Sequence, residues 1–170
     1  MKIAIVKLSA LGDIIHSMVA LQFIKKYHPE YEIDWIVEER FKGLLINNPH
    51  LNAVHTVCLK EIKSWRLFLN EIRKIKNFGS YDVVIDAQGL IKSSIVARII
   101  KSESCFGFDR KSIRETFASY LYNKKVYVDH ELNTIDRMVK LICFPFNIEV
   151  SKKEIINKEI FLYSRSNFLA

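Results

Sequence analysis

Short apolar segments alternate with amphipathic segments along most of the 170 residues, and this alternation is the feature that most limits the possible folds. The apolar segments are continuous, as in KIAIVKL at 2–8 and DVVID at 82–86. Continuous apolar strands are typical of a parallel sheet with helices on both faces, because each strand is then buried on two sides. The sequence therefore predicts an α/β fold built on a doubly wound, Rossmann-like parallel sheet.

The order of strands and helices follows from the apolar spacing and from the positions of proline and glycine. Strands are expected at 2–8, 32–38, 53–59, 82–86, 105–108, 124–129 and 158–163. Helices are expected at 14–27, 40–47, 65–77, 90–101, 112–121 and 131–143. No internal linker is visible in this order, which predicts one domain over 1–150 and a terminal strand, or the start of an interdomain segment, over 151–170.

The charge balance is basic, with 26 lysines and arginines against 19 aspartates and glutamates and a net charge of +7. Such a surplus predicts anionic partners, which include nucleic acids, membrane surfaces and phosphorylated substrates. The apolar stretches fall short of the roughly 18 residues that a membrane-spanning helix needs. Lys7 interrupts the first apolar run, which is not typical of a secretory leader, so a cytoplasmic chain is expected.

Two common kinds of site are excluded by composition. The five glycines form neither G-x-G-x-x-G nor G-K-[ST], so the usual backbone cradles for dinucleotides and for P-loop nucleotides are missing. The three cysteines, Cys58, Cys105 and Cys143, stand far apart, and they are expected to be small core residues with no metal or disulfide role.

Asp13 is the first candidate for chemistry, because the loop SALGD at 9–13 joins the first strand to a helix. Loops at the carboxyl ends of parallel strands line the crevice where such sheets bind ligands. Asp13 could cap the following helix by accepting a backbone N–H, which is the commoner role of an aspartate at this position. It could instead be a general base, with Gly12 supplying the tight turn. The residues alone leave both roles open.

The second candidate loop is DAQGLIKSS at 86–94. Asp86 ends a strand and could either support the first loop or satisfy nearby backbone N–H groups, and Gly89 permits a close backbone approach. Lys92 lies near a helix N-terminus, where the helix dipole disfavours a cation, so an anionic ligand there becomes more plausible.

Cations gather in 60–76 and 110–125, and most of them are expected to be solvated. Lys60, Lys63 and Arg66 lie in or beside a loop, with Glu61 as the only opposing charge among them. Arg114 is expected early in a helix, where a bidentate contact to a phosphate or carboxylate would justify its charge. The histidines at 16 and 130 are expected to serve packing or hydrogen bonding, and the two tryptophans, at 35 and 65, to be core or loop anchors.

Four segments together resemble glycosyltransferase family 9, the ADP-heptose-dependent lipopolysaccharide heptosyltransferases, and its type I enzymes in particular. These segments are KLSALGDIIH at 7–16, DWIVEE at 34–39, YDVVIDAQGLIKS at 81–93 and RETFASYLYNKK at 114–125. The resemblance runs in order from the first residue to about 145 and implies a GT-B architecture of two Rossmann-like halves. It implies that this chain is the N-terminal, acceptor-binding half, with the C-terminal donor-binding domain absent from the 170 residues.

The reaction that the resemblance implies is an inverting transfer of L-glycero-D-manno-heptose from ADP-heptose to the first Kdo of Kdo2-lipid A. No metal or other cofactor is expected. The implied partners are the Kdo2-lipid A acceptor and the cytoplasmic face of the inner membrane, with the protein peripheral to the bilayer, monomeric and not bound to nucleic acid. The alternatives are a non-catalytic module for nucleic acid or an anionic membrane, and an inactive truncated product.

The resemblance also assigns residues. It makes Asp13 the general base and places Lys7, Ser9 and Gly12 in the acceptor-binding loop around it. Three further acceptor-binding cations fall on Lys60, Lys63 and Arg114. Apart from the resemblance, Asp86, Gln88, Gly89 and Lys92 are expected to support the first loop. Relatives are often richer in arginine around 60–64, and lysine lacks the bidentate fork, so contacts there are expected to be arranged differently.

Overall fold

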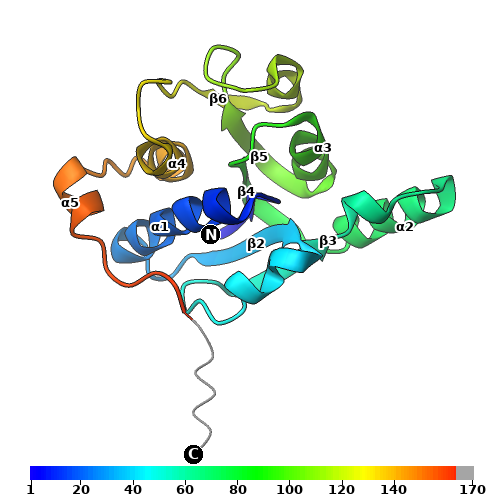
Figure 1. The fold of residues 1–170 in the computed structure, drawn as a ribbon, viewed down its shortest axis with the longest axis horizontal. Helices are drawn as coiled ribbons and strands as arrows, with labels where there is room; N and C mark the ends of the chain where they lie inside the picture. The colour runs from blue at the N-terminus through cyan, green and yellow to red at the C-terminus, as the bar shows by residue number, and fades with distance from the viewer. Residues whose placement is uncertain (164–170) are drawn as a thin grey trace, which may run out of the picture.

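A computed structural model of the chain describes residues 1–163 and shows a six-stranded, fully parallel sheet with helices on both faces (Figure 1). The strand order is β3-β2-β1-β4-β5-β6, so the chain starts in the middle and extends outward in both directions. The strands are β1 (Lys2–Val6), β2 (Glu32–Glu38), β3 (Ala53–Val57), β4 (Ser80–Asp86), β5 (Lys101–Phe108) and β6 (Lys124–Val126). The predicted doubly wound, Rossmann-like α/β fold is confirmed.

The helices form two layers. They are α1 (Leu11–Tyr27), α2 (Trp65–Lys76), α3 (Ile91–Ile99), α4 (Thr134–Cys143) and α5 (Lys152–Ile156). Four 3-10 helices connect them: η1 (Glu39–Leu44), η2 (Leu59–Glu61), η3 (Thr116–Leu121) and η4 (Phe144–Phe146). Helix α1 packs against α4, and α2 packs against α3. Right-handed crossovers in both directions from the central strands place these two pairs on opposite faces of the sheet.

The core is centred on β1 and α1. Residues 3–6 of β1 are fully buried, and so are four consecutive residues of α1, Met18 to Leu21. A helix that touched only the sheet would bury one stripe of side chains. Four buried residues in a row mean that α1 is covered on more than one side, by the sheet and by α4.

The topology decides where a site can form. All six strands are parallel, so their carboxyl ends meet at one edge of the sheet, and the connecting helices run back from that edge. The first turns of α1, α2 and α3 therefore lie along the same edge. We call this the carboxyl edge. Among the described residues, none of the helices is both long and apolar enough to cross a bilayer.

Three expected elements are wrong. The helix expected at 40–47 is only the 3-10 helix η1. The helix expected at 112–121 is only the 3-10 helix η3, because the Asp109 carboxylate accepts hydrogen bonds from the backbone N–H groups of Lys111 and Ser112 and holds a turn there. Arg114 therefore precedes η3, and the expectation that it lies early in a helix is wrong.

The strand expected at 158–163, the terminal strand of the 151–170 segment, is also absent from the described structure, and the short helix α5 precedes this stretch. The backbone of 158–163 bonds to side chains rather than to a strand edge. The N–H of Glu159 donates to Gln22 of α1 at 2.9 Å, and the carbonyl of Phe161 accepts from Asn48 at 3.3 Å. The rest of 151–170, at 164–170, lies outside the described residues.

Smaller differences concern β5, the tryptophans and the cysteines. Strand β5 begins at Lys101, earlier than expected, so α3 ends at Ile99. Trp35 is fully buried, as expected for an anchor, but Trp65 is 71% exposed, so that expectation was wrong for Trp65. Cys105 and Cys143 are buried free thiols and Cys58 is half-buried. Within the described part of the chain, no cluster of His, Cys, Asp or Glu could hold a metal ion.

Candidate functional site

Asp13 lies in the first turn of α1 and does not cap it. The helix begins at Leu11, so Asp13 is its third residue, and the capping position falls on Ala10, which has no side-chain bond to the helix. The helix-cap interpretation of Asp13 is therefore wrong. Its carboxylate is 52% exposed at the carboxyl edge, and it is free to meet a ligand.

Lys7 brings a cation to the Asp13 carboxylate. Its Nζ lies 3.7 Å from Asp13 Oδ2, while the lysine side chain itself is only 5% exposed. Burial lowers the pKa of Lys7, and the charges of Asp13 and Asp86 oppose that shift. A buried ammonium needs such compensation, so the two carboxylates and Lys7 form one electrostatic unit at the end of β1.

Gln88 ties the first loop to the end of β4. Its Oε1 accepts the backbone N–H groups of Leu8 at 2.8 Å and Ser9 at 3.0 Å, and its Nε2 donates to Ser9 Oγ at 3.1 Å. These three bonds hold the turn that leads into α1 and therefore the position of Asp13.

Asp86 holds the segment that carries Gln88. This carboxylate is fully buried, and its Oδ1 accepts the backbone N–H groups of Gln88 at 2.8 Å and Gly89 at 3.3 Å. Its Oδ2 accepts the hydroxyls of Ser93 at 2.8 Å and Tyr122 at 2.6 Å. Burial raises the pKa of Asp86, and the four hydrogen bonds oppose that rise. Asp86 thus takes both of the roles left open by the sequence: it satisfies backbone N–H groups and, through Gln88, supports the first loop.

Gly89 adopts a conformation that requires glycine. Its φ is +70°, and a Cβ placed there would lie 3.1 Å from Ile113 and 3.2 Å from Phe108. The tight turn after β4 therefore depends on both the left-handed backbone and the missing side chain.

A cavity of about 210 Å³ opens between these groups and α4. Its polar lining comprises Lys7, Asp13, Gln88, Ser112, Arg114, Thr134 and Arg137. One exposed carboxylate therefore faces three cations, contributed by the residue after β1, the loop after β5 and α4. Such a set can hold an anionic ligand and accept a proton from it.

Arg137 is the site residue that the sequence analysis missed. Its Nη2 donates to the carbonyl of Ser112 at 2.8 Å, and its Nη1 bonds Nδ1 of His130 at 3.0 Å. The guanidinium lies 5.4 Å from the centre of the Phe108 ring, and its buried Nε has no hydrogen-bond partner among residues 1–163. Arg137 could have been predicted by the argument applied to Lys92, because it is also a cation near the N-terminus of a helix.

Lys60, Lys63 and Lys92 do not line this cavity. Lys60 lies in η2 and Lys63 in the turn before α2, after β3, whereas Lys92 is the second residue of α3. All three are exposed. They lie at the carboxyl edge on the side covered by α2 and α3, so the structure brings Lys7, Gln88 and Arg114 to Asp13 but separates these three lysines from it.

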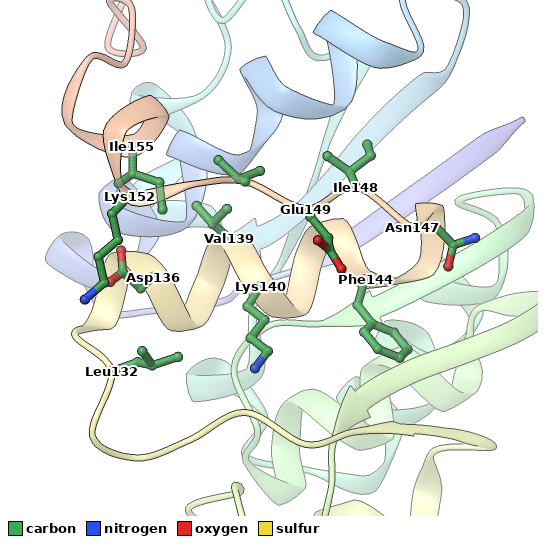
Figure 2. A pocket seen from close by; sticks show the side chains of 11 residues that line it. Leu132, Asp136, Val139, Lys140, Phe144, Asn147, Ile148, Glu149, Lys152 and Ile155 are labelled. Carbon is green, nitrogen blue, oxygen red and sulfur yellow. The ribbon is translucent and has the colours of Figure 1, made fainter.

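A larger cavity, of about 550 Å³, lies elsewhere, between α4 and the segment 147–155 (Figure 2). Apolar side chains such as Val139, Ile148 and Ile155 line it, and Asp136, Lys140 and Lys152 stand around it. None of the residues expected to carry function is among its lining residues. The smaller cavity at Asp13 is therefore the candidate site.

Comparison with known proteins identifies the family. The model of glycosyltransferase family 9 (heptosyltransferase) matches residues 71–161, which is more than half of the chain. The chain belongs to glycosyltransferase family 9. The resemblance on which the site residues were assigned is thereby confirmed at the level of the family.

Curated family 9 proteins with a similar sequence are named lipopolysaccharide heptosyltransferase 1. The protein from Campylobacter coli is 45% identical over 162 residues, which are 94% of this chain and 46% of that protein. The protein from Pseudomonas aeruginosa is 32% identical over 151 residues, with coverage of 83% and 41%. The chain therefore spans about half the length of the curated relatives it matches.

Solved family 9 structures agree with the fold. The structure of E. coli heptosyltransferase WaaC with ADP matches with a TM-score of 0.80 and 29% identity, covering 89% of this chain and 49% of that one. The WaaC structure with ADP-2-deoxy-2-fluoro heptose matches with a TM-score of 0.82 and 28% identity, with coverage of 89% and 50%. The expected GT-B relationship is confirmed for this half of the architecture.

Proposed function

We propose that this chain is the acceptor-binding half of an inverting glycosyltransferase that moves L-glycero-D-manno-heptose from ADP-heptose to the first Kdo of Kdo2-lipid A. The observation that carries the proposal is the cavity in which the half-exposed carboxylate of Asp13 faces Lys7, Arg114 and Arg137. Family membership and the names of the relatives support heptose as the transferred group.

Asp13 acts as the general base. The attacking Kdo hydroxyl forms a bond to the anomeric carbon of the heptose while the bond from that carbon to ADP breaks, and ADP leaves with the electron pair on the opposite face. The transition state is oxocarbenium-like, so the hydroxyl becomes acidic only late in the reaction. A carboxylate is then a sufficient base, and Asp13 takes the proton.

The cations bind the acceptor. Kdo carries a carboxylate and lipid A carries phosphates, and arginine suits both because its planar fork donates two parallel hydrogen bonds. Arg114 and Arg137 bind these anions beside Asp13. Ser9 and Gly12 line the turn that faces the acceptor sugar, and Lys60 and Lys63 reach the more distant phosphates from the turn before α2.

Asp86, Gln88 and Gly89 keep the loop in place rather than touching the acceptor. The donor ADP-heptose binds mostly to a second Rossmann-like half, the counterpart of the remaining length of the relatives. No metal or other cofactor takes part. The protein works as a monomer at the cytoplasmic face of the inner membrane, where its acceptor lies.

Heptose transfer tests the base. The chain is joined to the donor-binding half of a family 9 relative and assayed with ADP-heptose and Kdo2-lipid A. Asp13→Asn should lower kcat by about 10²–10⁴-fold, the usual contribution of a general base. Glu103→Gln, an isosteric change at an exposed glutamate in β5, is the matched control. Undiminished turnover in Asp13→Asn would remove Asp13 from this role.

Acceptor binding tests the cations separately. The chain alone is titrated with a deacylated Kdo2-lipid A, which is soluble. Arg114→Ala and Arg137→Ala should each weaken binding by roughly tenfold or more, the value of a charge-assisted hydrogen bond. Unchanged affinity in both variants, or tight binding of RNA in place of the saccharide, would favour the non-catalytic alternative.

A further inference from the structure

The surface formed by the start of α2 and the start of α3 combines exposed apolar side chains with cations. We define this α2–α3 surface by Trp65, Arg66, Leu67, Ile91, Lys92 and Ile95, all of which are exposed. It lies at the carboxyl edge and does not include the cavity at Asp13.

Helix α2 is amphipathic but poorly covered. Its sequence, WRLFLNEIRKIK, places apolar residues on one face and cations on the other, yet only Ile75 is buried. In Figure 1, α2 extends away from the sheet, whereas α1 and α3 lie against it. A helix with this composition, low in overall hydrophobicity and rich in Trp, Leu, Lys and Arg, is typical of segments that lie in a membrane interface.

An apolar groove of about 280 Å³ separates α2 from α3. It is lined by Phe68 and Ile72 from α2 and by Ile95 and Ile99 from α3, and Lys92 also contributes to the lining. Trp65 is 71% exposed and Leu67 is 47% exposed, and both side chains continue this apolar area to the start of α2. Exposed apolar patches that are bordered by cations mark interaction sites.

The positive charge of α2, α3 and the turn before α2 indicates the kind of partner. Segments 59–76 and 91–99 together contain eight lysines and arginines and two glutamates, a net charge of +6, whereas the whole chain carries +7. A second copy of the same surface would bring like charges together. A nucleic acid would meet the charge, but it would leave Leu67, Ile91 and Ile95 without an apolar partner, because aliphatic side chains do not stack on bases as aromatic ones do.

We infer that the α2–α3 surface docks the protein on an anionic lipid bilayer, with Trp65 and Leu67 in the interface and Arg66 and Lys92 on the lipid headgroups. Tryptophan favours the headgroup level of a bilayer, and each lysine or arginine near an anionic surface adds to binding. The inference rests on the proposed function, because that function identifies the membrane as the one that carries the acceptor. It adds the surface that holds the acceptor-binding half beside that acceptor.

Tryptophan fluorescence tests the docking surface with the full chain and no acceptor. Only two tryptophans occur, and Trp35 is fully buried, so signals that depend on added vesicles report Trp65. Vesicles of phosphatidylcholine with phosphatidylglycerol should shift the Trp65 emission to the blue, and lipids brominated on their acyl chains should quench it. Vesicles of phosphatidylcholine alone should bind much more weakly, and added salt should release the protein.

Charge-reversal variants locate the surface by cosedimentation with the same vesicles. Arg66→Glu changes the charge at this position by two units and should weaken partitioning into the vesicles by about 25-fold. Lys101→Glu is the matched control, because Lys101 is also exposed and lies at the start of β5, at the opposite edge of the sheet. This variant should leave partitioning close to that of the unmodified chain. Both positions are exposed, so neither change should disturb the fold, and circular dichroism checks this for each variant.

The inference is overturned by absence of binding to phosphatidylglycerol vesicles, by equal losses in Arg66→Glu and Lys101→Glu, or by an unquenched Trp65 in vesicle-bound protein. RNA binding through Arg66 without vesicle binding would also overturn it. The proposed function fails separately: loss of vesicle binding leaves the titration with deacylated acceptor intact, whereas a failed titration leaves vesicle binding intact.

Discussion

The hydroxyl of Tyr122 donates to the buried Asp86 carboxylate over 2.6 Å, and this contact gives a quantitative test of how the first loop is held. Tyr122 is 3% exposed, so Tyr122→Phe removes the hydroxyl without opening the ring site to water. Asp86 Oδ2 then retains only the Ser93 hydroxyl. A hydrogen bond to a charged group contributes about 1.5–3 kcal/mol to stability, so the free energy of unfolding should fall by that amount.

Urea unfolding followed by circular dichroism measures the loss. A loss of about 2 kcal/mol corresponds to a fall in Tm of roughly 4–8 °C for a chain of this size. Tyr120→Phe is the matched control, because Tyr120 is two residues away and 59% exposed. Its change should stay within about 0.5 kcal/mol, as for most surface substitutions.

The pH dependence gives a second readout. Burial raises the pKa of Asp86 above its ordinary 3.8, and the hydroxyl of Tyr122 is one of the bonds that favour the ionised form. Removal of that bond raises the folded pKa of Asp86 further in Tyr122→Phe. The stability difference between the unmodified chain and Tyr122→Phe should therefore be complete above the folded pKa of the variant and should shrink as the pH falls from there through the folded pKa of the unmodified chain. Equal stability of Tyr122→Phe and Tyr120→Phe at neutral pH would refute the account of the buried carboxylate.

Three further substitutions probe other contacts. Gly107→Ala would place a Cβ 2.3–2.5 Å from the ring of Tyr122, so thermal unfolding should show a loss of about 3 kcal/mol, whereas Gly43→Ala, with nothing within 4 Å, should be tolerated. Gln88→Leu leaves two backbone N–H groups of the first loop without their acceptor, which should cost about 1–3 kcal/mol and speed hydrogen exchange at residues 8–9. Burial alone would raise the pKa of Asp34, but its bonds from nearby side chains lower it below 3.8, so its stabilisation is complete above pH 3.8 and is lost as the pH falls through the lower folded value. Asp34→Asn should therefore lose less stability than the unmodified chain in an acid titration; an equal loss would contradict this.

Local patterns predicted much of the fold correctly. The continuous apolar runs located β1, β2, β3 and β4 to within two or three residues at each end, because burial on both faces leaves a local signature. The errors fell where a side chain competes with regular structure. The Asp109 carboxylate holds a turn where a helix at 112–121 was expected. The backbone of 158–163, where a strand was expected, bonds to the side chains of Gln22 and Asn48.

The candidate site was predictable only in part. Lys7, Asp13 and Gln88 follow central strands, so parallel topology alone brings them to the carboxyl edge. Arg137 joins them from the first turn of α4, far along the chain, and its bonds to Ser112 and His130 are invisible in the spacing of residues. The separation of Lys60 and Lys63 from the cavity likewise depends on the face that α2 covers.

The sequence by itself determined the class of fold and the edge at which ligands bind, because apolar periodicity and the handedness of crossovers act over short stretches of chain. Only the tertiary structure decided which cations meet Asp13. That choice depends on the packing of α4 against α1 and on the turn at Asp109, which bring residues more than a hundred positions apart to one 210 Å³ cavity. Contacts between such distant residues leave no periodic trace in the sequence, since they are set by how whole elements pack.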